Sequence, residues 1–251
     1  MSRPIALITG ATSGIGKATA YLLASKYDLI LCGRRKSLLK AIEKELSSIT
    51  QVKVLSFDLS KSAELDDAWN GLEPNWTNID LLINNAGNAH GLDPIELGKI
   101  SDWDQMIDIN IKGLLYISHK IIPSMVQRKK GHIINLGSIA GDDPYLKGNV
   151  YCASKSAVHT ISETMRLDLN KYGIKVSTIK PGLVETNFSK VRFKGNIDKA
   201  TKPYQGLKPL LAEDVANIIQ YVTLTPDNVV ITDLTVMPTA QASATIINRG
   251  N

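Results

Sequence analysis

Short apolar runs alternate with longer amphipathic stretches along almost the whole chain. The apolar runs have the length of buried strands in a parallel sheet, whereas the amphipathic stretches repeat at the spacing of helices that bury one face. The runs predict strands over residues 5–9, 29–32, 52–57, 81–83, 132–136, 175–179 and 229–236. The first amphipathic stretch predicts a helix that ends near residue 25. The later stretches predict helices over residues 37–46, 63–72, about 103–127, about 151–171 and 214–222.

This alternation predicts an α/β fold with a doubly wound parallel sheet, the Rossmann arrangement. Right-handed crossovers between parallel strands place helices on both faces of such a sheet. Residues 183–211 break the alternation because they are polar, basic and interrupted by Gly and Pro. We expect this segment to be a small lid inserted over the carboxyl ends of the strands. Residues 1–251 contain no linker or internal repeat, so we expect a single domain.

Length and charge narrow the class of protein. A chain of 251 residues is long enough for one large α/β domain or two small ones. The net charge of +5 is mild, and the longest basic run, residues 128–130, has the position of a helix end. We therefore expect no nucleic-acid partner. No apolar run has the length of a membrane-spanning helix, and the first strand begins almost at once, so we expect no membrane partner and a cytoplasmic location.

The two cysteines give no sign of a disulfide framework or a metal centre. Cys32 and Cys152 lie outside any CxxC pattern. A structural zinc site is therefore not expected, and a reducing cytoplasm suits the chain. We expect no metal ligands.

A glycine-rich loop follows the first expected strand and opens the first expected helix. Residues 9–16 read TGATSGIG, so the glycines are spaced GxxxGxG. Glycines at such a junction allow a tight turn and let backbone N–H groups approach a pyrophosphate at the helix N-terminus. A glycine-rich turn without a ligand is the alternative, but the strand–loop–helix context favours a dinucleotide. The expected contacts are Gly10, Thr12, Ser13, Gly14, Ile15 and Gly16.

The end of the second expected strand indicates which dinucleotide is bound. Chains that bind NAD carry an acidic residue near this position, which accepts hydrogen bonds from the ribose. This chain has Arg34 and Arg35 instead, whose guanidinium groups suit the additional 2′-phosphate of NADP. Two solvated arginines at a helix start are the alternative, although positive charge there opposes the helix dipole. We expect the cofactor to be NADP.

Further polar residues end the third and fourth expected strands. Asp58 has the position to accept a hydrogen bond from the adenine amino group, and Asn85 has the position to face the ribose. Each residue alone equally suits a strand-end turn. Leu59, Ala86 and Gly87 follow them and complete the expected cofactor contacts in this region.

Tyr151 and Lys155 are the strongest candidates for chemistry. Four residues are about one helical turn, so on a helix their side chains share a face. An ammonium beside a phenol favours the phenolate, which brings a tyrosine pKa of about 10 closer to neutral. Such a tyrosine can exchange a proton with an alcohol or a carbonyl beside a hydride carrier.

Taken in order, these residues resemble the short-chain dehydrogenase/reductase family. The pattern YxxxK alone is common by chance, but the ordered set is specific and spans essentially the whole chain. The matching motifs are TGxxxGIG at 9–16, NNAG at 84–87, Asn110 in 108–110, Ser138 in 137–138, YxxxK at 151–155 and Pro181-Gly182.

The resemblance implies a catalytic role for four residues. Ser138 would orient the substrate oxygen, Tyr151 would exchange a proton with it, and Lys155 would lower the tyrosine pKa and hold the nicotinamide ribose. Asn110 would position a water that passes protons from Lys155 to solvent. Without the family, Asn110 equally suits a helix-kinking or capping amide, and Ser138 equally suits a strand-end turn.

The resemblance also implies contacts after the sixth strand and an oligomeric state. Residues 181–188 would wrap the nicotinamide amide and the phosphates, through Pro181, Gly182, Val184 and Thr186. Members of the family are usually homotetramers built on the two long helices. The segments 148–151, 181–184, 188–195 and 236–239 resemble the subgroup of NADP-dependent 3-hydroxy acid dehydrogenases.

That subgroup implies a small anionic substrate, such as L-serine, L-allo-threonine, 3-hydroxypropionate or the corresponding semialdehyde. We expect Arg192, with Lys194 as a second candidate, to hold the anion, and Tyr145 and Phe188 to form pocket walls beside Ser138 and Tyr151. A solvated loop face is the alternative for the two cations. A broader carbonyl or aldehyde reductase, for sulfoacetaldehyde or diketones, is the alternative enzyme. A non-catalytic NADP-sensing protein is the alternative from another class.

Overall fold

The computed structural model describes residues 3–250, and its centre is a seven-stranded sheet in which all neighbouring strands are parallel. The spatial order is β3-β2-β1-β4-β5-β6-β7, so the chain winds outward to one side of β1 and then to the other. The strands are β1 (Ile5–Thr9), β2 (Asp28–Gly33), β3 (Val52–Ser56), β4 (Ile79–Asn84), β5 (Gly131–Leu136), β6 (Ile174–Pro181) and β7 (Asp233–Val236). This reversal between β1 and β4 is the switch point at which doubly wound sheets bind ligands.

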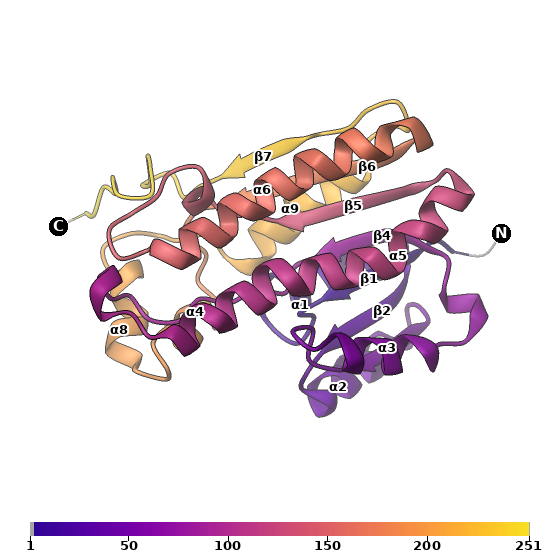
Figure 1. Ribbon diagram of the computed structural model, residues 1–251, viewed down its shortest axis with the longest axis horizontal. Helices are drawn as coiled ribbons and strands as arrows, with labels where there is room; N and C mark the ends of the chain where they lie inside the picture. Colours follow the sequence, from indigo (N-terminus) through magenta and orange to yellow (C-terminus); the bar gives the residue numbers. More distant parts are fainter. Residues whose placement is uncertain (1–2, 251) are drawn as a thin grey trace.

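Helices cover both faces of the sheet (Figure 1). The principal helices are α1 (Gly14–Leu23), α2 (Lys36–Leu46), α3 (Ser62–Asn70), α4 (Ile100–Ile107), α5 (Leu114–Arg128), α6 (Asn149–Leu169), α7 (Phe188–Arg192), α8 (Ile197–Thr201) and α9 (Ala212–Thr223). Single helical turns are η1 (Pro74–Trp76), η2 (Ile95–Leu97), η4 (Ile139–Gly141), η5 (Asn170–Tyr172) and η6 (Lys202–Tyr204), and η3 (Asp108–Gly113) is a π-helical segment between α4 and α5.

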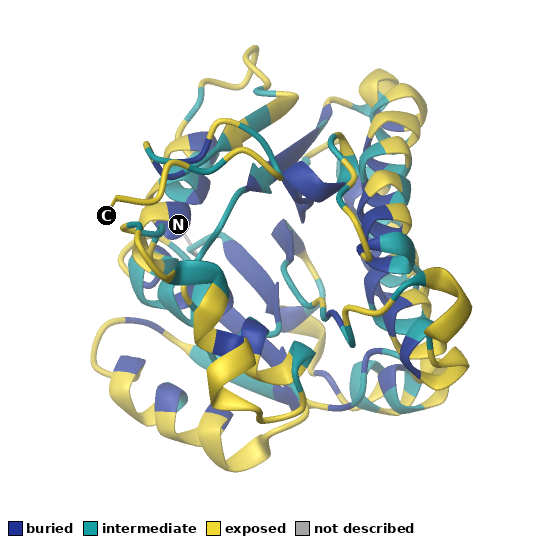
Figure 2. Cartoon of the chain, turned by 90° about the vertical axis from the view of Figure 1, so that its left-hand side faces the viewer, coloured by how far each residue is buried: buried dark blue, intermediate teal, exposed yellow. Residues whose placement is uncertain are grey.

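The strands are apolar because each is buried on both faces. Leu7 of β1 belongs to a buried cluster with residues of α3, α5 and α6, whereas its neighbours Ala6 and Ile8 belong to a second cluster with residues of α1, α2 and α9. Successive side chains of a strand point to opposite faces, which explains the two separate clusters. Figure 2, seen from the carboxyl ends of the strands, shows the buried strands at the centre and the exposed residues on the surrounding helices and loops.

The lid, residues 183–211, lies at the carboxyl ends of the strands, as expected, and carries α7 and α8 (Figure 1). Its two ends are held side by side, because Leu210 donates to the Leu183 carbonyl at 3.0 Å and Glu185 donates to the Leu210 carbonyl at 2.8 Å. The segment therefore leaves and rejoins the fold at nearly one point.

The doubly wound sheet is confirmed, and two elements differ most from their expectation. The last strand begins at Asp233 rather than near residue 229, since Val229 and Val230 are each about 40% exposed. The long helix expected over residues 103–127 is interrupted by the π-helical segment η3. Such segments are frequent at functional sites, because one extra residue in a turn redirects a side chain. No helix within residues 3–250 has the length and apolarity to cross a bilayer.

Candidate active site

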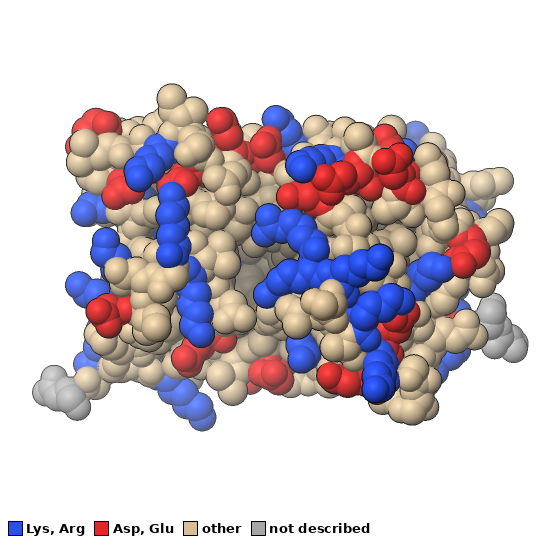
Figure 3. All heavy atoms as spheres, turned by 90° about the horizontal axis from the view of Figure 1, so that it is seen from below, with Lys and Arg blue, Asp and Glu red and all other residues tan. Residues whose placement is uncertain are grey.

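A cavity of about 740 Å³ lies at the carboxyl ends of the strands. Residues that follow β1, β2, β3, β4, β5 and β6 line it together with α7 and the C-terminal tail, and the lining includes almost every expected site residue. Figure 3 shows Lys and Arg side chains gathered beside a hollow on one face of the protein. Within residues 3–250 no group of three or more His, Cys, Asp or Glu side chains is arranged to hold a metal ion.

The glycine loop needs its glycines because Asn85 holds it closely. The Asn85 side-chain nitrogen donates to the carbonyl oxygens of Thr9, at 2.8 Å, and Gly10, at 3.3 Å. A Cβ at Gly16 would lie 2.4 Å from that nitrogen and 2.6 Å from the Gly10 oxygen. Gly10 and Gly14 also have positive φ angles, which glycine adopts without strain. The Asn85 amide nitrogen therefore binds the loop, and Asn85 also lines the cavity, where its contact with the ribose stays a prediction.

The start of α1 is open toward the cavity and suits an anion. Ser13 at its N-cap makes no side-chain cap bond, so the first backbone N–H groups remain available. A methyl group at Gly14 would lie 3.2 Å from Thr186 of the lid, so the loop and the lid approach each other across this point. The missing side chains of the glycines leave room for the pyrophosphate of a dinucleotide.

Arg34 and Arg35 line the cavity at the end of β2, and both are exposed. Arg35 donates to the hydroxyls of Thr12 and Ser13, the latter at 2.9 Å, and Arg34 pairs with Asp58 at 3.6 Å. Two cations beside the open start of α1 fit the additional phosphate of NADP. The residues present therefore suit this cofactor, at the place where the sequence predicts it.

Asp58, after β3, is ionised and already has partners. Its carboxylate accepts from the backbone N–H and the hydroxyl of Ser60. Partial burial works against ionisation, but these bonds and the charge of Arg34 hold the pKa of Asp58 below its usual range. Leu59, Ala86 and Gly87 line the cavity beside it, as expected.

Tyr151 and Lys155 lie on α6, and Ser138 lies between β5 and η4, so two elements bring the three side chains to one wall of the cavity. Tyr151 is 8% exposed and packs against Phe188 of the lid, with ring centroids 5.6 Å apart. The Ser138 hydroxyl accepts from the Ala140 N–H at 3.1 Å and still borders the cavity. The sequence motifs thus converge in space.

The electrostatics of Tyr151 differ from the expectation. Burial, followed by the nearby Tyr145, raises the pKa of Tyr151, while Ser138 and the charge of Arg192 act in the opposite direction. Lys155 is not among the groups that shift it. The expected acidification by Lys155 is therefore not found in this structure.

The Lys155 side chain is bound to the backbone at the end of β5. Its ammonium donates to the Leu136 carbonyl oxygen at 2.8 Å, and burial lowers the pKa of Lys155 to about 8. A Cβ on Gly87 would lie 3.5 Å from this nitrogen and 3.2 Å from the Asn110 oxygen, so these groups surround one small space.

Asn110 lies in the π-helical segment and is almost completely buried. Its side chain accepts from the N–H of Asn88 at 2.9 Å, and it donates to the carbonyl of Asn88 at 2.9 Å and to the hydroxyl of Ser154 at 3.0 Å. These bonds clamp the loop after β4 to α6. Asn110 is thus a structural amide by its hydrogen bonds and a neighbour of Lys155 by its place.

The lid brings Arg192 into the pocket. Its guanidinium donates to the Gly91 carbonyl at 2.9 Å and to the Tyr145 hydroxyl at 2.7 Å. The same guanidinium carbon lies 5.5 Å from the ring centroids of both Tyr145 and Tyr151. Lys194 instead pairs with Asp102 at 2.8 Å. Arg192, and not Lys194, is therefore the cation beside Tyr151.

The C-terminal tail contributes residues that the sequence did not indicate. Gln241 is buried, and its side-chain oxygen accepts from the Leu183 N–H at 2.8 Å. A Cβ at Gly182 would lie 2.4 Å from that oxygen, so Gln241 supports the end of β6 at Pro181 and the segment after it, which carries Val184 and Thr186. No motif surrounds residue 241, and its role depends on where the tail folds.

Comparisons with known proteins identify the family of this chain. A family model described as short chain dehydrogenase matches residues 4–196. The NADP-dependent 3-hydroxy acid dehydrogenase YdfG of Escherichia coli strain K12 is 41% identical over 242 residues, 96% of this chain and 97% of that protein. The serine 3-dehydrogenase of Rhizobium radiobacter is 40% identical over 239 residues, 95% of each chain.

A solved structure of a related enzyme has the same fold. The closed form of a serine dehydrogenase complexed with NADP+ superposes with a TM-score of 0.91 at 41% identity, covering 96% of this chain and 97% of that chain. The expected cofactor and reaction class are confirmed by these relatives. The chain belongs to the short-chain dehydrogenase family and is an NADP-dependent oxidoreductase.

Proposed function

We propose that this enzyme acts on the 3-hydroxyl group of a short hydroxy acid, or reduces the corresponding semialdehyde. The observation that carries the proposal is the Arg192 guanidinium, 5.5 Å from the Tyr151 ring. Arg192 is a half-buried cation beside Tyr151, the residue proposed to exchange the proton. This arrangement favours a substrate whose carboxylate is a few atoms from its alcohol. The printed names of the relatives, a 3-hydroxy acid dehydrogenase and a serine 3-dehydrogenase, support the same class.

In this mechanism the side chains bind and orient the substrate and move a proton. NADP supplies the hydride acceptor or donor when bound, through the contacts of the glycine loop, Arg34 and Arg35. The Ser138 hydroxyl donates to the substrate oxygen, and the Tyr151 hydroxyl gives that oxygen a proton during reduction or takes it during oxidation. Arg192 holds the carboxylate, with Tyr145 and Phe188 as walls.

Lys155 and Asn110 supply protons from behind Tyr151. The pKa of Lys155, lowered to about 8 by burial, allows this amine to exchange a proton near neutral pH. Asn110 lies beside it and would position a water that connects it to solvent. The raised pKa of Tyr151 keeps the phenol protonated, which suits the direction of carbonyl reduction.

We also propose a cytoplasmic homotetramer. Leu115 on α5 is 40% exposed and Leu167 on α6 is 74% exposed, and apolar side chains on the two long helices suit contact with another copy. Both cysteines are free thiols, which suits a reducing compartment. Light scattering at several protein concentrations tests the assembly.

The substrate test compares an acid with its uncharged match. Reduced-nicotinamide absorbance is followed with NADP and L-serine, L-allo-threonine, 3-hydroxypropionate or the methyl ester of 3-hydroxypropionate, with Tyr151→Phe as background. We expect turnover of the acids and a kcat/KM at least about 10-fold lower for the ester, since it lacks one charge-assisted contact. Equal turnover of acid and ester would favour a broader carbonyl reductase. No turnover of any compound, including aldehydes with NADPH, would favour a sensing protein.

A further inference from the structure

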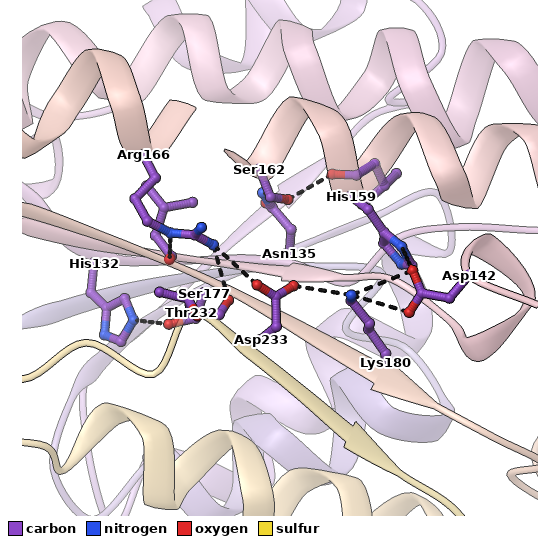
Figure 4. Close-up of polar contacts among 12 residues, drawn as sticks. His132, Asn135, Asp142, His159, Ser162, Arg166, Ser177, Lys180, Thr232 and Asp233 are labelled. Carbon is purple, nitrogen blue, oxygen red and sulfur yellow. Dashed lines mark hydrogen bonds and ion pairs between the residues drawn. The ribbon is translucent and has the colours of Figure 1, made fainter. Parts of the chain in front are cut away.

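His159 continues the face of α6 that holds the catalytic pair. Tyr151, Lys155 and His159 follow one another at intervals of four residues, so each lies about one turn beyond the last. The His159 side chain is only 11% exposed. Figure 4 shows it extending from α6 toward Asp142. The mechanism above gives this buried imidazole no part.

The hydrogen bonds of His159 fix which nitrogen carries the proton. Its Nε2 faces the backbone N–H of Ser138 at 3.4 Å, and an N–H can only donate, so Nε2 accepts. Nδ1 therefore carries the hydrogen and donates to an Asp142 carboxylate oxygen at 2.8 Å. The bond to Ser138 is long, since such distances usually lie below about 3.2 Å. The shape of the space around the ring must therefore also hold the His159 imidazole in place.

Two glycines on either side of Ser138 provide that fit. A Cβ at Gly137 would lie 2.5 Å from Nε2 of His159, and a Cβ at Gly141 would lie 2.5 Å from its Cε1. The ring thus fills a slot that exists only because both positions lack a side chain. Ser138 lies between them, with its N–H toward the imidazole and its hydroxyl at the cavity.

A charge network holds Asp142 in place. Lys180 of β6 contacts Asp142 at 3.1 Å and Asp233 of β7 at 3.2 Å, and Arg166 of α6 contacts Asp233 at 3.6 Å (Figure 4). Partial burial disfavours the carboxylate of Asp142, but Lys180 and His159 hold its pKa below the usual range. An ionised Asp142 accepts from Nδ1 and keeps the ring in one tautomer and one orientation.

We propose that His159 is a positioning residue, which sets the place of the Ser138 hydroxyl through the neutral imidazole between the Ser138 N–H and Asp142. The proposal rests on the proposed role of Ser138 in orienting the substrate. His159 touches neither substrate nor cofactor and acts through the turn formed by residues 137–141.

The proposal has a consequence for the dependence on pH. The charged groups facing the ring are Asp142 after η4, Lys180 on β6 and Lys155 on α6. Burial lowers the pKa of His159, the two lysines lower it further, and Asp142 opposes them. An imidazolium would point an N–H at the N–H of Ser138, so protonation should displace the turn. The rate should therefore fall on the acid side.

Two amide substitutions separate the contacts. In His159→Gln the amide reaches the place of Nε2 and keeps an acceptor for Ser138, whereas in His159→Asn it reaches only the place of Nδ1 and keeps a donor for Asp142. We expect His159→Asn to lower kcat about 10- to 100-fold, as a misplacement near 1 Å does, with the Kd for NADP changed less than about 2-fold. His159→Gln should retain most of kcat and lose the acid limb of its pH profile.

Two further measurements distinguish positioning from loss of fold. Adding His159→Asn to Ser138→Ala should cause no further loss, because the histidine acts through the serine. Hydrogen exchange of residues 137–141 in the protein alone should speed up in His159→Asn and not in His159→Gln. Multiplied losses in the double variant, wild-type kcat in His159→Asn, or unchanged exchange would each overturn the inference. A Ser138→Ala variant with wild-type kcat would overturn the role of Ser138 as well.

Discussion

The Lys155 ammonium donates a hydrogen bond to the backbone carbonyl oxygen of Leu136, at 2.8 Å, and Lys155 is only 7% exposed. The bond ties the first half of α6 to the end of β5, one residue before the turn that carries Ser138. Burial without a carboxylate partner lowers the pKa of Lys155 to about 8. Lys155 and Ser138, for which we propose the roles of proton donor and substrate-binding residue, are therefore both fixed at the end of the same strand.

The first prediction is that Lys155→Met gains stability while losing activity. The folded pKa lies below the unfolded value of 10.5, so the unfolded state binds more protons between these values and stability rises with pH through that window. Removing the ammonium should therefore stabilise the protein at pH 7 by up to about 3 kcal/mol, and the gain should shrink as pH rises from 8 to 10.5. Urea unfolding at pH 7 and pH 10 measures both, and kcat should fall at least about 100-fold. A variant less stable than wild type at pH 7 would contradict the argument.

A second prediction concerns the choice between NADP and NAD. Arg35→Leu should raise the Kd for NADPH about 10- to 100-fold, as loss of a charge-assisted bond does, and leave that for NADH nearly unchanged. Lys36→Leu, an exposed cation at the next position, is the matched control and should change neither. Fluorescence titration with both reduced nucleotides checks this. Equal weakening of the two nucleotides would show that Arg35 supports the loop through Thr12 and Ser13 only.

A third prediction tests the substrate anchor. Arg192→Gln should raise the KM for 3-hydroxypropionate about 10-fold or more with little change in kcat, because the carboxylate contact exists in both ground and transition states. The methyl ester should be affected far less. Lys190→Gln, on the exposed side of α7, is the control and should behave as wild type. If Arg192→Gln raises KM equally for acid and ester, its role is to hold the lid through Gly91 and Tyr145.

A fourth prediction follows from His132, which lies in β5 and contacts the Ser177 hydroxyl at 2.9 Å (Figure 4). Burial lowers the pKa of His132 to about 4, and Lys175 adds to the effect. Between pH 6.5, the ordinary pKa of histidine, and pH 4 the unfolded state then binds more protons than the folded state, so stability falls as pH decreases through this range. Between pH 7.5 and pH 5 this residue should remove about 2 kcal/mol.

Replacing the titrating ring tests that sign. His132→Gln keeps a hydrogen-bonding group but cannot gain a proton, so its stability should depend less on pH over this range. Urea unfolding of both proteins at pH 5 and pH 7.5 gives the difference. If both proteins lose the same stability between pH 7.5 and pH 5, the pH dependence belongs to other groups.

The strands were readable from the sequence because burial on both faces requires apolar runs. β1, β2 and β5 lie within about one residue of their expected bounds for this reason. The run at Val229 and Val230 misled the same reasoning, because hydrophobicity alone does not distinguish a strand from an exposed loop. The π-helical segment at Asn110 was missed because its composition is that of an ordinary helix.

Site residues that belong to sequence motifs could be predicted from the sequence, whereas residues that act through tertiary contacts could not. Gly10 and Arg35 were expected from their place after a strand, and the structure places both at the cavity. His159 and Gln241 were missed, since each depends on a segment distant in the chain: Gly137 and Asp142 for one, Leu183 for the other. The orientation of Lys155 toward Leu136 likewise depends on how α6 docks on the sheet.

The slot around the imidazole makes positions 137, 141 and 159 a single unit for protein engineering. Any side chain added at 137 or 141 would collide with the ring at 2.5 Å, whereas trimming residue 159 alone would leave a void. Libraries that vary these sites one at a time should therefore yield mostly inactive variants. Enlarging Gly137 while shrinking the histidine is the combination through which this wall of the pocket can be redesigned, whereas a Cβ at Gly141 would also lie 2.7 Å from the backbone carbonyl carbon of Lys155.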